Sequence, residues 1–363
     1  MADGGNLIKS EQISKLINAV QSYAHDIQQA GVVPAEKKKS IFDVCPLPQK
    51  PSYQRGLGRK GIRVPLGYDA VTGEVFSCTF DDTNAFGFLM GGAGSGKSSL
   101  LHILITGILT RYHPDDVELW LADFNRVGFM RYKTHMPPHL RYLLLDSSPL
   151  YCYGFIDKLT EEFERRQRIF SEHNWDNIAD VPAGFPMPIV FVILDEFDVM
   201  SEAIKDSDEY RIRLQQIVSK GRKFGFRIVF STQKYTTGSS GLTQTARINL
   251  NVRMAMYASD QDELVQTIGV PQLKDGEKQL IRSIRPYHVL YKQADRTQSY
   301  RLDYVENFFM GPGELDARDK WVDSLSRLMR KQTGSGGDDI MTYEDKSPSV
   351  EDGATVERFG DDP

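Results

Sequence analysis

The middle of the chain alternates short apolar runs with stretches in which apolar residues recur every three or four positions. The apolar runs, which predict buried strands, lie near residues 86–90, 117–122, 141–145, 189–194 and 227–231. The periodic stretches predict helices near residues 97–111, 157–172 and 208–223. Crossovers of this length join parallel strands and place helices on both faces of the sheet. The pattern therefore predicts an α/β fold around a mainly parallel sheet.

An N-terminal region precedes this alternation. Apolar residues at helical spacing share one face of residues 11–30, and Ser10 can cap the first turn, so an amphipathic helix is expected there. Residues 33–61 contain several Pro and Lys residues, which indicate an extended connector. We therefore expect an N-terminal segment at residues 1–59 and a main domain at residues 60–310.

Further strands are expected on either side of the alternating region. Apolar and polar residues alternate around a turn at residues 69–73, which predicts a hairpin from Ile62 to Thr79 that leads into the core. Strand-like runs also lie at residues 251–257 and 287–292.

The last region, residues 311–363, is expected to hold one short helix and a disordered tail. The helix is indicated by the spacing of Trp321, Leu325 and Leu328. Beyond Gly334 the chain is rich in Gly, Ser and Asp, a composition that favours disorder.

Composition narrows the class of protein. With 40% hydrophobic and 26% charged residues, the chain can bury a large core. Cys45, Cys78 and Cys152 lack metal-ligand spacing, so we expect neither a disulfide framework nor a zinc site, and a reducing compartment. The N-terminus has no signal-peptide pattern, and no apolar segment is long enough to span a bilayer. We expect a cytoplasmic protein, whose membrane anchor, if it has one, lies on a partner or on a part of the protein outside this sequence.

The net charge of −5 is concentrated at the end of the chain. Residues 331–363 hold nine acidic residues against three basic ones, which leaves the rest of the chain close to neutral. A near-neutral body neither requires nor excludes a nucleic acid partner.

A glycine-rich loop, called the P-loop below, joins the apolar run at residues 86–90 to the predicted helix at residues 97–111. It fits the GxxxxGK[ST] pattern and consists of Gly91, Gly92, Ala93, Gly94, Ser95, Gly96, Lys97 and Ser98, followed by Ser99. Glycines let backbone N–H groups point at phosphates, and the helix N-terminus adds the positive end of its dipole. Lys97 is then expected on the β- and γ-phosphates and the Ser98 hydroxyl on Mg²⁺, which makes ATP and Mg²⁺ the expected ligands. The alternative is a turn that merely joins a strand to a helix, but strand, loop, Lys-Ser pair and helix in this order favour the phosphate site.

Polar residues end two further buried-strand runs. Asp195 and Glu196 follow the run that starts at Ile189, and acids at the carboxyl end of a parallel strand lie where ligands bind in open α/β sheets. We expect Asp195 to hold Mg²⁺ through water and Glu196 to orient or deprotonate the attacking water, although such a pair can also be a helix N-cap with a solvated neighbour. Gln233, after the run that starts at Arg227, could contact the γ-phosphate or its water, or only cap the sheet edge.

The chain resembles the motor domain of FtsK/SpoIIIE-type ATPases over about residues 60–305. The resemblance is carried, in order, by GGAGSGKSSLL, by LADFNRVGFMRY followed by PPHLRYLLLD, and by VILDEFDVM, SKGRKFGFRIVFSTQ and ARINLNVRMAMY. It implies a RecA-like P-loop NTPase core, assembly into a homo-oligomeric, hexameric ring, and ATP-driven movement of a polymer. It also implies DNA as the cargo in the chromosome and conjugation branches, and secreted polypeptide in the EssC/EccC branch of type VII secretion.

Local features favour the secretion branch slightly. Those that resemble it are Val64-Pro65-Leu66-Gly67, Glu164-Arg165-Arg166-Gln167-Arg168 and Ile268-Gly269-Val270-Pro271. Two departures weaken a transfer of DNA-translocase details: Thr232-Gln233-Lys234-Tyr235 stands where those enzymes read TQRP, and Asp123-Phe124-Asn125-Arg126 stands where they have a lysine after Asp-Pro. In the other direction, secretion ATPases usually join several such domains behind a membrane anchor, whereas this chain has one P-loop.

The resemblance also implies an arginine that reaches the site from a neighbouring subunit. The candidates in or beside the motifs are Arg165, Arg166, Arg222 and Arg253, each of which could instead lie on a solvated helix face or in a structural ion pair. The loops expected to face the pore of a ring, residues 126–133 and 234–242, contain both basic and apolar residues and do not decide between DNA and polypeptide.

Three functions stay open at this point. The chain could be a hydrolysing ring motor for secreted protein, a DNA translocase, or a nucleotide-binding assembly module with little turnover. Lys97, Ser98, Asp195 and Glu196 favour a working motor, because a module that no longer hydrolyses ATP has no chemical need for the acid pair.

Overall fold

The computed structural model describes residues 39–49, 53–233, 249–258, 260–269, 284–294, 300–333 and 341–343. The helix expected at residues 11–30 lies outside this part of the chain. Within the expected connector the structure has two short 3-10 helices, η1 (Ile41–Asp43) and η2 (Gly58–Lys60).

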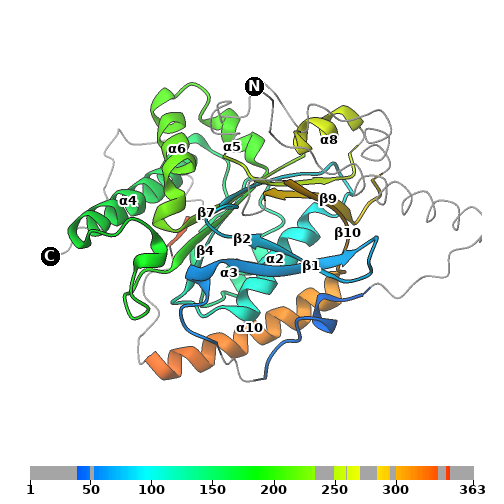
Figure 1. The fold of residues 1–363 in the computed structure, drawn as a ribbon, viewed down its shortest axis with the longest axis horizontal. Helices are drawn as coiled ribbons and strands as arrows, with labels where there is room; N and C mark the ends of the chain where they lie inside the picture. The colour runs from blue at the N-terminus through cyan, green and yellow to red at the C-terminus, as the bar shows by residue number, and fades with distance from the viewer. Residues whose placement is uncertain are drawn as a thin grey trace, which may run out of the picture.

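Eleven strands of the described residues form one sheet, in the spatial order β11-β5-β4-β6-β7-β3-β8-β9-β10-β1-β2. Figure 1 labels β1, β2, β4, β7, β9 and β10 of this sheet. The parallel part consists of β5 (Leu140–Leu144), β4 (Val117–Asp123), β6 (Ile189–Asp195), β7 (Phe226–Thr232), β3 (Phe86–Met90) and β8 (Val252–Met256). All the strands predicted from the alternating pattern are therefore present, and the mainly parallel sheet is confirmed.

The remaining strands extend the sheet beyond β8 in antiparallel fashion. They are β9 (His288–Ala294), β10 (Tyr300–Asn307), β1 (Ile62–Asp69) and β2 (Val75–Phe80). β1 and β2 form the expected hairpin, with Ile62 opposite Phe80. β1 also pairs with β10, which brings the start and the end of the main domain together in one sheet.

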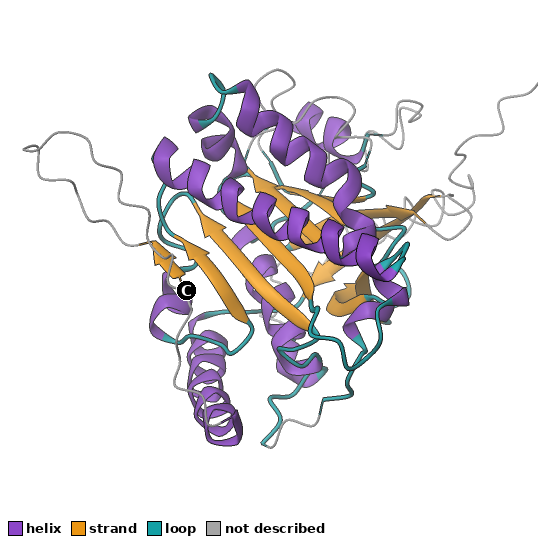
Figure 2. Cartoon of the chain, turned by 90° about the vertical axis from the view of Figure 1, so that its left-hand side faces the viewer, coloured by secondary structure: helices purple, strands orange, loops and turns teal. Residues whose placement is uncertain are grey.

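Helices cover both faces of the sheet, as the crossover pattern predicted (Figure 2). One face carries α2 (Lys97–Arg111), α3 (Met130–Thr134) and α10 (Pro312–Thr333), and the other carries α4 (Pro149–His173), α5 (Phe197–Ala203) and α6 (Asp208–Lys220). The short elements are α8 (Gln261–Ile268), η3 (Ile178–Asp180) and η4 (Gly221–Phe224). Because both faces are covered, every residue of β6 and β7 is buried, including the polar ones at their carboxyl ends.

Two expectations about the lengths of helices and one about the C-terminal tail need correction. The helix expected at residues 157–172 begins earlier, because Pro149 occupies the first turn of α4 after an extended Ser148. The helix expected to be short is α10, which has 22 residues. Within the tail expected to be disordered, β11 (Met341–Tyr343) pairs in parallel with β5, because β5 offers a free sheet edge there.

In the part of the chain that the structure describes, no helix combines the length and the apolar character needed to cross a bilayer.

Candidate nucleotide-binding site

The P-loop joins β3 to α2 and is fastened to the neighbouring strands. The Gly91 N–H donates to the Thr232 carbonyl at 3.2 Å, and the Gly92 N–H donates to the Tyr257 carbonyl at 2.8 Å. Gly96, directly before α2, has a φ of +97°, a backbone conformation that favours glycine. The predicted strand, loop and helix are thus present in the expected order, with Lys97 as the first helical residue.

Lys97 lies between the two acids that follow β6. Its Nζ atom is 2.5 Å from Asp195 Oδ1 and 2.9 Å from Glu196 Oε1, and all three side chains are buried. Burial by itself lowers the pKa of the Lys97 ammonium, but the two carboxylates outweigh burial, so that the pKa is raised. The lysine is therefore a protonated, fixed positive charge at the base of the loop.

The acid pair is positioned by the strand order. β6 and β3 are separated by β7, whose Ser231 hydroxyl donates to Asp195 Oδ1 at 2.7 Å. Glu196 has a φ of +56°, an uncommon value for this residue type, and is the first residue beyond β6. That turn leaves the Glu196 carboxylate beside Lys97 while Asp195 still belongs to the strand.

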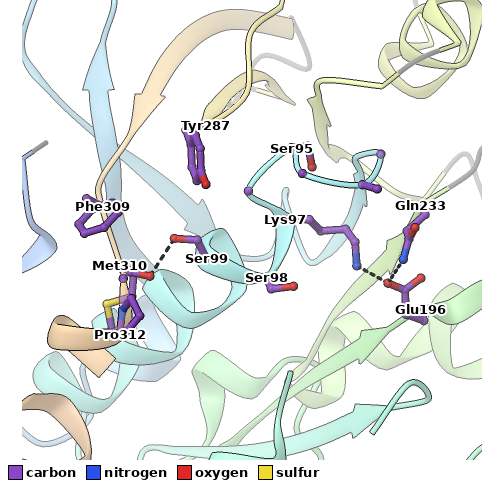
Figure 3. A pocket seen from close by; sticks show the side chains of 15 residues that line it. Ser95, Lys97, Ser98, Ser99, Glu196, Gln233, Tyr287, Phe309, Met310 and Pro312 are labelled. Carbon is purple, nitrogen blue, oxygen red and sulfur yellow. Dashed lines mark hydrogen bonds and ion pairs between the residues drawn. The ribbon is translucent and has the colours of Figure 1, made fainter. Parts of the chain in front are cut away.

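Gln233 lies beside Glu196. Its amide Nε2 donates to Glu196 Oε1 at 2.7 Å, so that Lys97, Glu196 and Gln233 form a hydrogen-bonded series across the ends of three elements (Figure 3). The structure thus brings together the P-loop lysine, the acid pair that ends β6 and the glutamine that follows β7.

These side chains face a cavity of about 450 Å³, a volume typical of small-molecule sites. The P-loop and Ser99 line the middle of this cavity, and Glu196 and Gln233 line one end. The other end is lined by Tyr287, Phe309, Met310, Gly311 and Pro312 (Figure 3). None of these five residues was expected at the site from the sequence, although the Gly-Pro pair at 311–312 signals a turn.

The donor set fits a nucleotide with Mg²⁺. Lys97, Ser231 and the Glu196 N–H all donate to Asp195 Oδ1, which leaves the Oδ2 atom for a cation or its water shell. The Ser98 hydroxyl is exposed toward the cavity. The Ser95 hydroxyl is buried without a hydrogen-bond partner among the described residues. Asp195 Oδ2 and the Ser98 hydroxyl fit a Mg²⁺ site, because proteins usually hold Mg²⁺ by one or two of their own oxygens together with phosphate oxygens and water.

The chain matches the profile of one known protein family. The FtsK/SpoIIIE family profile matches residues 52–237, just over half of the chain. The chain belongs to the FtsK/SpoIIIE family. The match includes the P-loop, the acid pair and Gln233, whereas the residues at the far end of the cavity lie beyond it.

The known proteins that are similar to this chain include proteins of type VII secretion and conjugation, and the chain spans only part of the secretion proteins. The type VII secretion system protein EssC of Staphylococcus aureus (strain MRSA252) is 27% identical over 183 residues, which span 50% of this chain and 12% of EssC. The cytoplasmic domain of the Thermomonospora curvata type VII secretion ATPase EccC superposes with a TM-score of 0.65 at 20% identity, covering 80% of this chain and 34% of that one. The pCW3 conjugation coupling protein TcpA, solved with ATPgS, superposes with a TM-score of 0.57 at 13% identity, covering 81% and 75% of the two chains. These similarities confirm the fold of a P-loop ATPase.

Two of the four arginine candidates, Arg253 and Arg222, differ from each other in burial and in hydrogen bonding. Arg253 donates to the carbonyls of Leu250 at 3.2 Å and Thr267 at 3.1 Å, so that it satisfies a backbone acceptor at the end of α8. Arg222 lies exposed in η4, just before the amino-terminal end of β7, whereas the P-loop follows the carboxyl end of the parallel strand β3.

The other two candidates lie on α4 and pair with the same acid. Arg166 is completely buried, donates to Glu162 Oε1 at 2.6 Å and to the Phe224 carbonyl at 2.9 Å. Arg165 donates to both carboxylate oxygens of Glu162 and is partly exposed. The arginine that a neighbouring subunit would supply stays a prediction.

Proposed function

We propose that this chain binds ATP with Mg²⁺ and hydrolyses it. The observation that carries the proposal is the hydrogen-bonded series from Lys97 through Glu196 to Gln233 at one end of the cavity. Binding of phosphates alone requires only the P-loop. A carboxylate held at 2.9 Å from the P-loop lysine and oriented by an amide adds the group that hydrolysis requires.

Glu196, Gln233 and Lys97 then have distinct roles. Glu196 accepts a proton from water as the water oxygen attacks the γ-phosphorus, and the bond from that phosphorus to the bridging oxygen breaks to give ADP and inorganic phosphate. Gln233 orients the Glu196 carboxylate and contacts the water or the γ-phosphate. Lys97 shares its charge between the acids and the phosphates. Mg²⁺, held by Ser98 and Asp195, supplies further positive charge at the phosphates when it is bound.

We further propose that the chain works as a ring motor in the cytoplasm. Membership of the FtsK/SpoIIIE family supports a homo-oligomer, in the form of a hexameric ring that moves a polymer. Arg222 suits the role of the arginine supplied to a neighbour better than Arg166, because its side chain is exposed. Contact with a membrane would come from an anchored partner or from an anchor elsewhere in the protein.

The segment at residues 126–133, which was expected to face a pore and which runs from the loop after β4 into α3, favours secreted polypeptide over DNA as the cargo. Its arginines are engaged within the chain, since Arg126 pairs with Asp146 and Arg131 pairs with acids of α10. In contrast, Val127 is 79% exposed and Met130 is 44% exposed. Exposed apolar side chains suit contact with an unfolded polypeptide, whereas a DNA motor needs cations available to phosphates.

The second loop expected at the pore, residues 234–242, lies outside the described residues.

The two alternatives are a DNA translocase and a module that binds ATP with little turnover. The fold similarity to TcpA, a conjugation coupling protein, is compatible with movement of DNA. A module that binds ATP without turning it over would share the P-loop, but the intact contacts of Glu196 and Gln233 speak against it.

Phosphate release by the purified oligomer tests the proposal. Glu196→Gln keeps an oxygen for Lys97 and Gln233, so we expect MgATP to bind while turnover falls about 10²- to 10⁴-fold, the range for loss of a general base. Lys97→Ala should abolish turnover together with MgATP binding. Glu202→Gln, the same change at an exposed acid of α5, serves as the control and should hydrolyse at the wild-type rate.

The outcomes separate the three functions. Undiminished multiple turnover in Glu196→Gln would rule out its role in activating water. Tight MgATP binding without turnover in the wild-type oligomer would favour the assembly module. Stimulation of turnover by duplex DNA at low salt, lost steeply as salt rises, would overturn the polypeptide assignment.

A further inference from the structure

An aromatic residue in a strained conformation lines the end of the cavity away from Glu196. Tyr287 has a φ of +63° and a side chain that is 42% exposed. For a tyrosine this left-handed conformation costs free energy, on the order of 1–2 kcal/mol, and it persists only where surrounding contacts hold it. Figure 3 shows the ring above Ser99, on the side of the P-loop opposite Gln233.

The contacts that hold Tyr287 connect it to the P-loop. Its backbone N–H donates to the Ser95 carbonyl at 2.7 Å, and its carbonyl accepts from the Asn307 N–H at 2.9 Å. The ring lies so close to Gly96 that a Cβ atom there would be 2.8 Å from the ring carbon Cδ1. The position of the ring relative to the phosphate loop is therefore fixed.

The opposite wall is the turn from Phe309 to Pro312, which leads directly into α10. The Phe309 N–H donates to the Lys39 carbonyl at 2.8 Å, and the Gly311 N–H donates to Glu314 Oε2 at 3.1 Å. A Cβ atom on Gly311 would lie 2.4 Å from the Phe309 ring, so glycine is what allows the ring to pack on the turn. The Ser99 hydroxyl donates to the Met310 carbonyl at 3.4 Å, which links this wall to the helix after the P-loop.

We propose that Tyr287 and the Phe309–Pro312 turn form the base subsite of the nucleotide and that Tyr287 binds a purine base by stacking. The inference rests on the proposed ATP site, because the phosphates define which end of the cavity receives the base. Pro312 has no N–H and the N–H groups of Phe309 and Gly311 already have acceptors, so the turn offers a base few donors and stacking on Tyr287 is the expected contact. Adenine and guanine should therefore bind with similar affinity.

The experiment uses two substitutions that separate the ring from the backbone. Tyr287→Asn removes the ring but tolerates a positive φ, and Tyr287→Phe keeps the ring without the hydroxyl. We would measure, by calorimetry on the whole chain, the dissociation constants of MgADP, MgGDP and magnesium tripolyphosphate, a probe without a base. Thermal unfolding of each variant shows whether its fold is retained.

We expect Tyr287→Asn to weaken MgADP and MgGDP about tenfold, as loss of one base–aromatic stack does, and to leave tripolyphosphate unchanged. Tyr287→Phe should bind all three probes like the wild type. Equal weakening of MgADP and tripolyphosphate, or no weakening of either, would overturn the inference. So would a wild-type affinity for MgGDP far below that for MgADP.

Failure of the base subsite and failure of the ATP site remain distinguishable. A wild-type chain that binds tripolyphosphate as tightly as MgADP has a phosphate site but no base subsite. A wild-type chain that binds none of the three probes has no nucleotide site at all.

Discussion

Lys97 serves two carboxylates with one ammonium group in a buried site. Asp195 has Ser231 and a backbone N–H as additional partners, whereas Glu196 depends on Lys97 and Gln233. Phosphates entering the P-loop would compete with the acids for Lys97, and the contact that Glu196 shares with Lys97 would weaken. Gln233 would then be the main partner that keeps the Glu196 carboxylate oriented for proton transfer.

Gln233 is therefore expected to act as a positioning residue for catalysis. Gln233→Ala should lower ATP turnover about tenfold or more while leaving MgADP affinity unchanged, because ADP lacks the γ-phosphate that Gln233 would approach. Gln233→Glu should place a second carboxylate near Glu196, so that the pair shares a proton and the acid limb of the pH–rate profile moves to higher pH. Steady-state phosphate release across pH measures both effects.

A purely structural role for Gln233 would give a different result. In that case both variants would lose stability and turnover together, without a shift of the pH–rate profile. Gln216→Ala, at an exposed glutamine of α6, is the matched control and should change neither property.

Among the elements, α10 is held on the body by a buried polar network. Arg318 is completely buried and donates to Asp319 Oδ1 at 2.5 Å and to the Tyr132 hydroxyl at 2.7 Å. Its Nη1 atom lies 3.4 Å from Nδ1 of His102, on the helix that begins at the P-loop. Arg131 of α3 adds an ion pair to Asp319. α2, α3 and α10 are thus fixed to one another next to the nucleotide cavity.

We expect Arg318→Met to reduce the free energy of unfolding by about 3 kcal/mol, because removing one partner of a buried charge network leaves the other charges undercompensated. Arg327→Met is the matched control on the same helix, where the arginine is exposed, and should change stability by no more than about 0.5 kcal/mol. Urea denaturation of the two variants gives the comparison. Equal stabilities would show that the network does not hold α10.

At the scale of the whole molecule, burial keeps two histidines neutral. Burial lowers the pKa of His102 to about 3 and the pKa of His139 to about 4. In the unfolded chain both histidines titrate near pH 6.5. Below that pH the unfolded chain therefore binds more protons than the native state does, and the native state loses stability.

The free energy of unfolding should thus fall as the pH drops from about 6.5 to about 5, by up to about 1.4 kcal/mol per pH unit for each histidine. This window lies above the pH range in which most carboxylates titrate. Urea denaturation at a series of pH values measures the slope, and His102→Gln should flatten it. His173→Gln, at an exposed histidine, is the control, and a slope equal in both variants would contradict the assignment to His102.

Much of the fold followed from local patterns. The parallel strands, the hairpin from Ile62 and the helix after the P-loop were predicted. They could be, because the spacing at which apolar residues recur, and the number of them, indicate which side of a helix or strand is buried. Helix starts and lengths were less certain, as Pro149 shows: it belongs to α4, although the apolar period becomes clear only one or two turns later. The pairing of β1 with β10 could not be predicted, since it depends on sheet order rather than on either strand alone.

The sequence by itself determined the P-loop and the presence of acids at a strand end, because both are set by residues adjacent in the chain. Only the tertiary structure decided which of these groups touch. Ser231 reaches Asp195 because β7 lies between β3 and β6, and Tyr287 reaches the P-loop from a turn almost two hundred positions away along the chain. Such contacts depend on the order of the strands in the sheet and on the path of the chain between them. The spacing of residues along the sequence does not report either one.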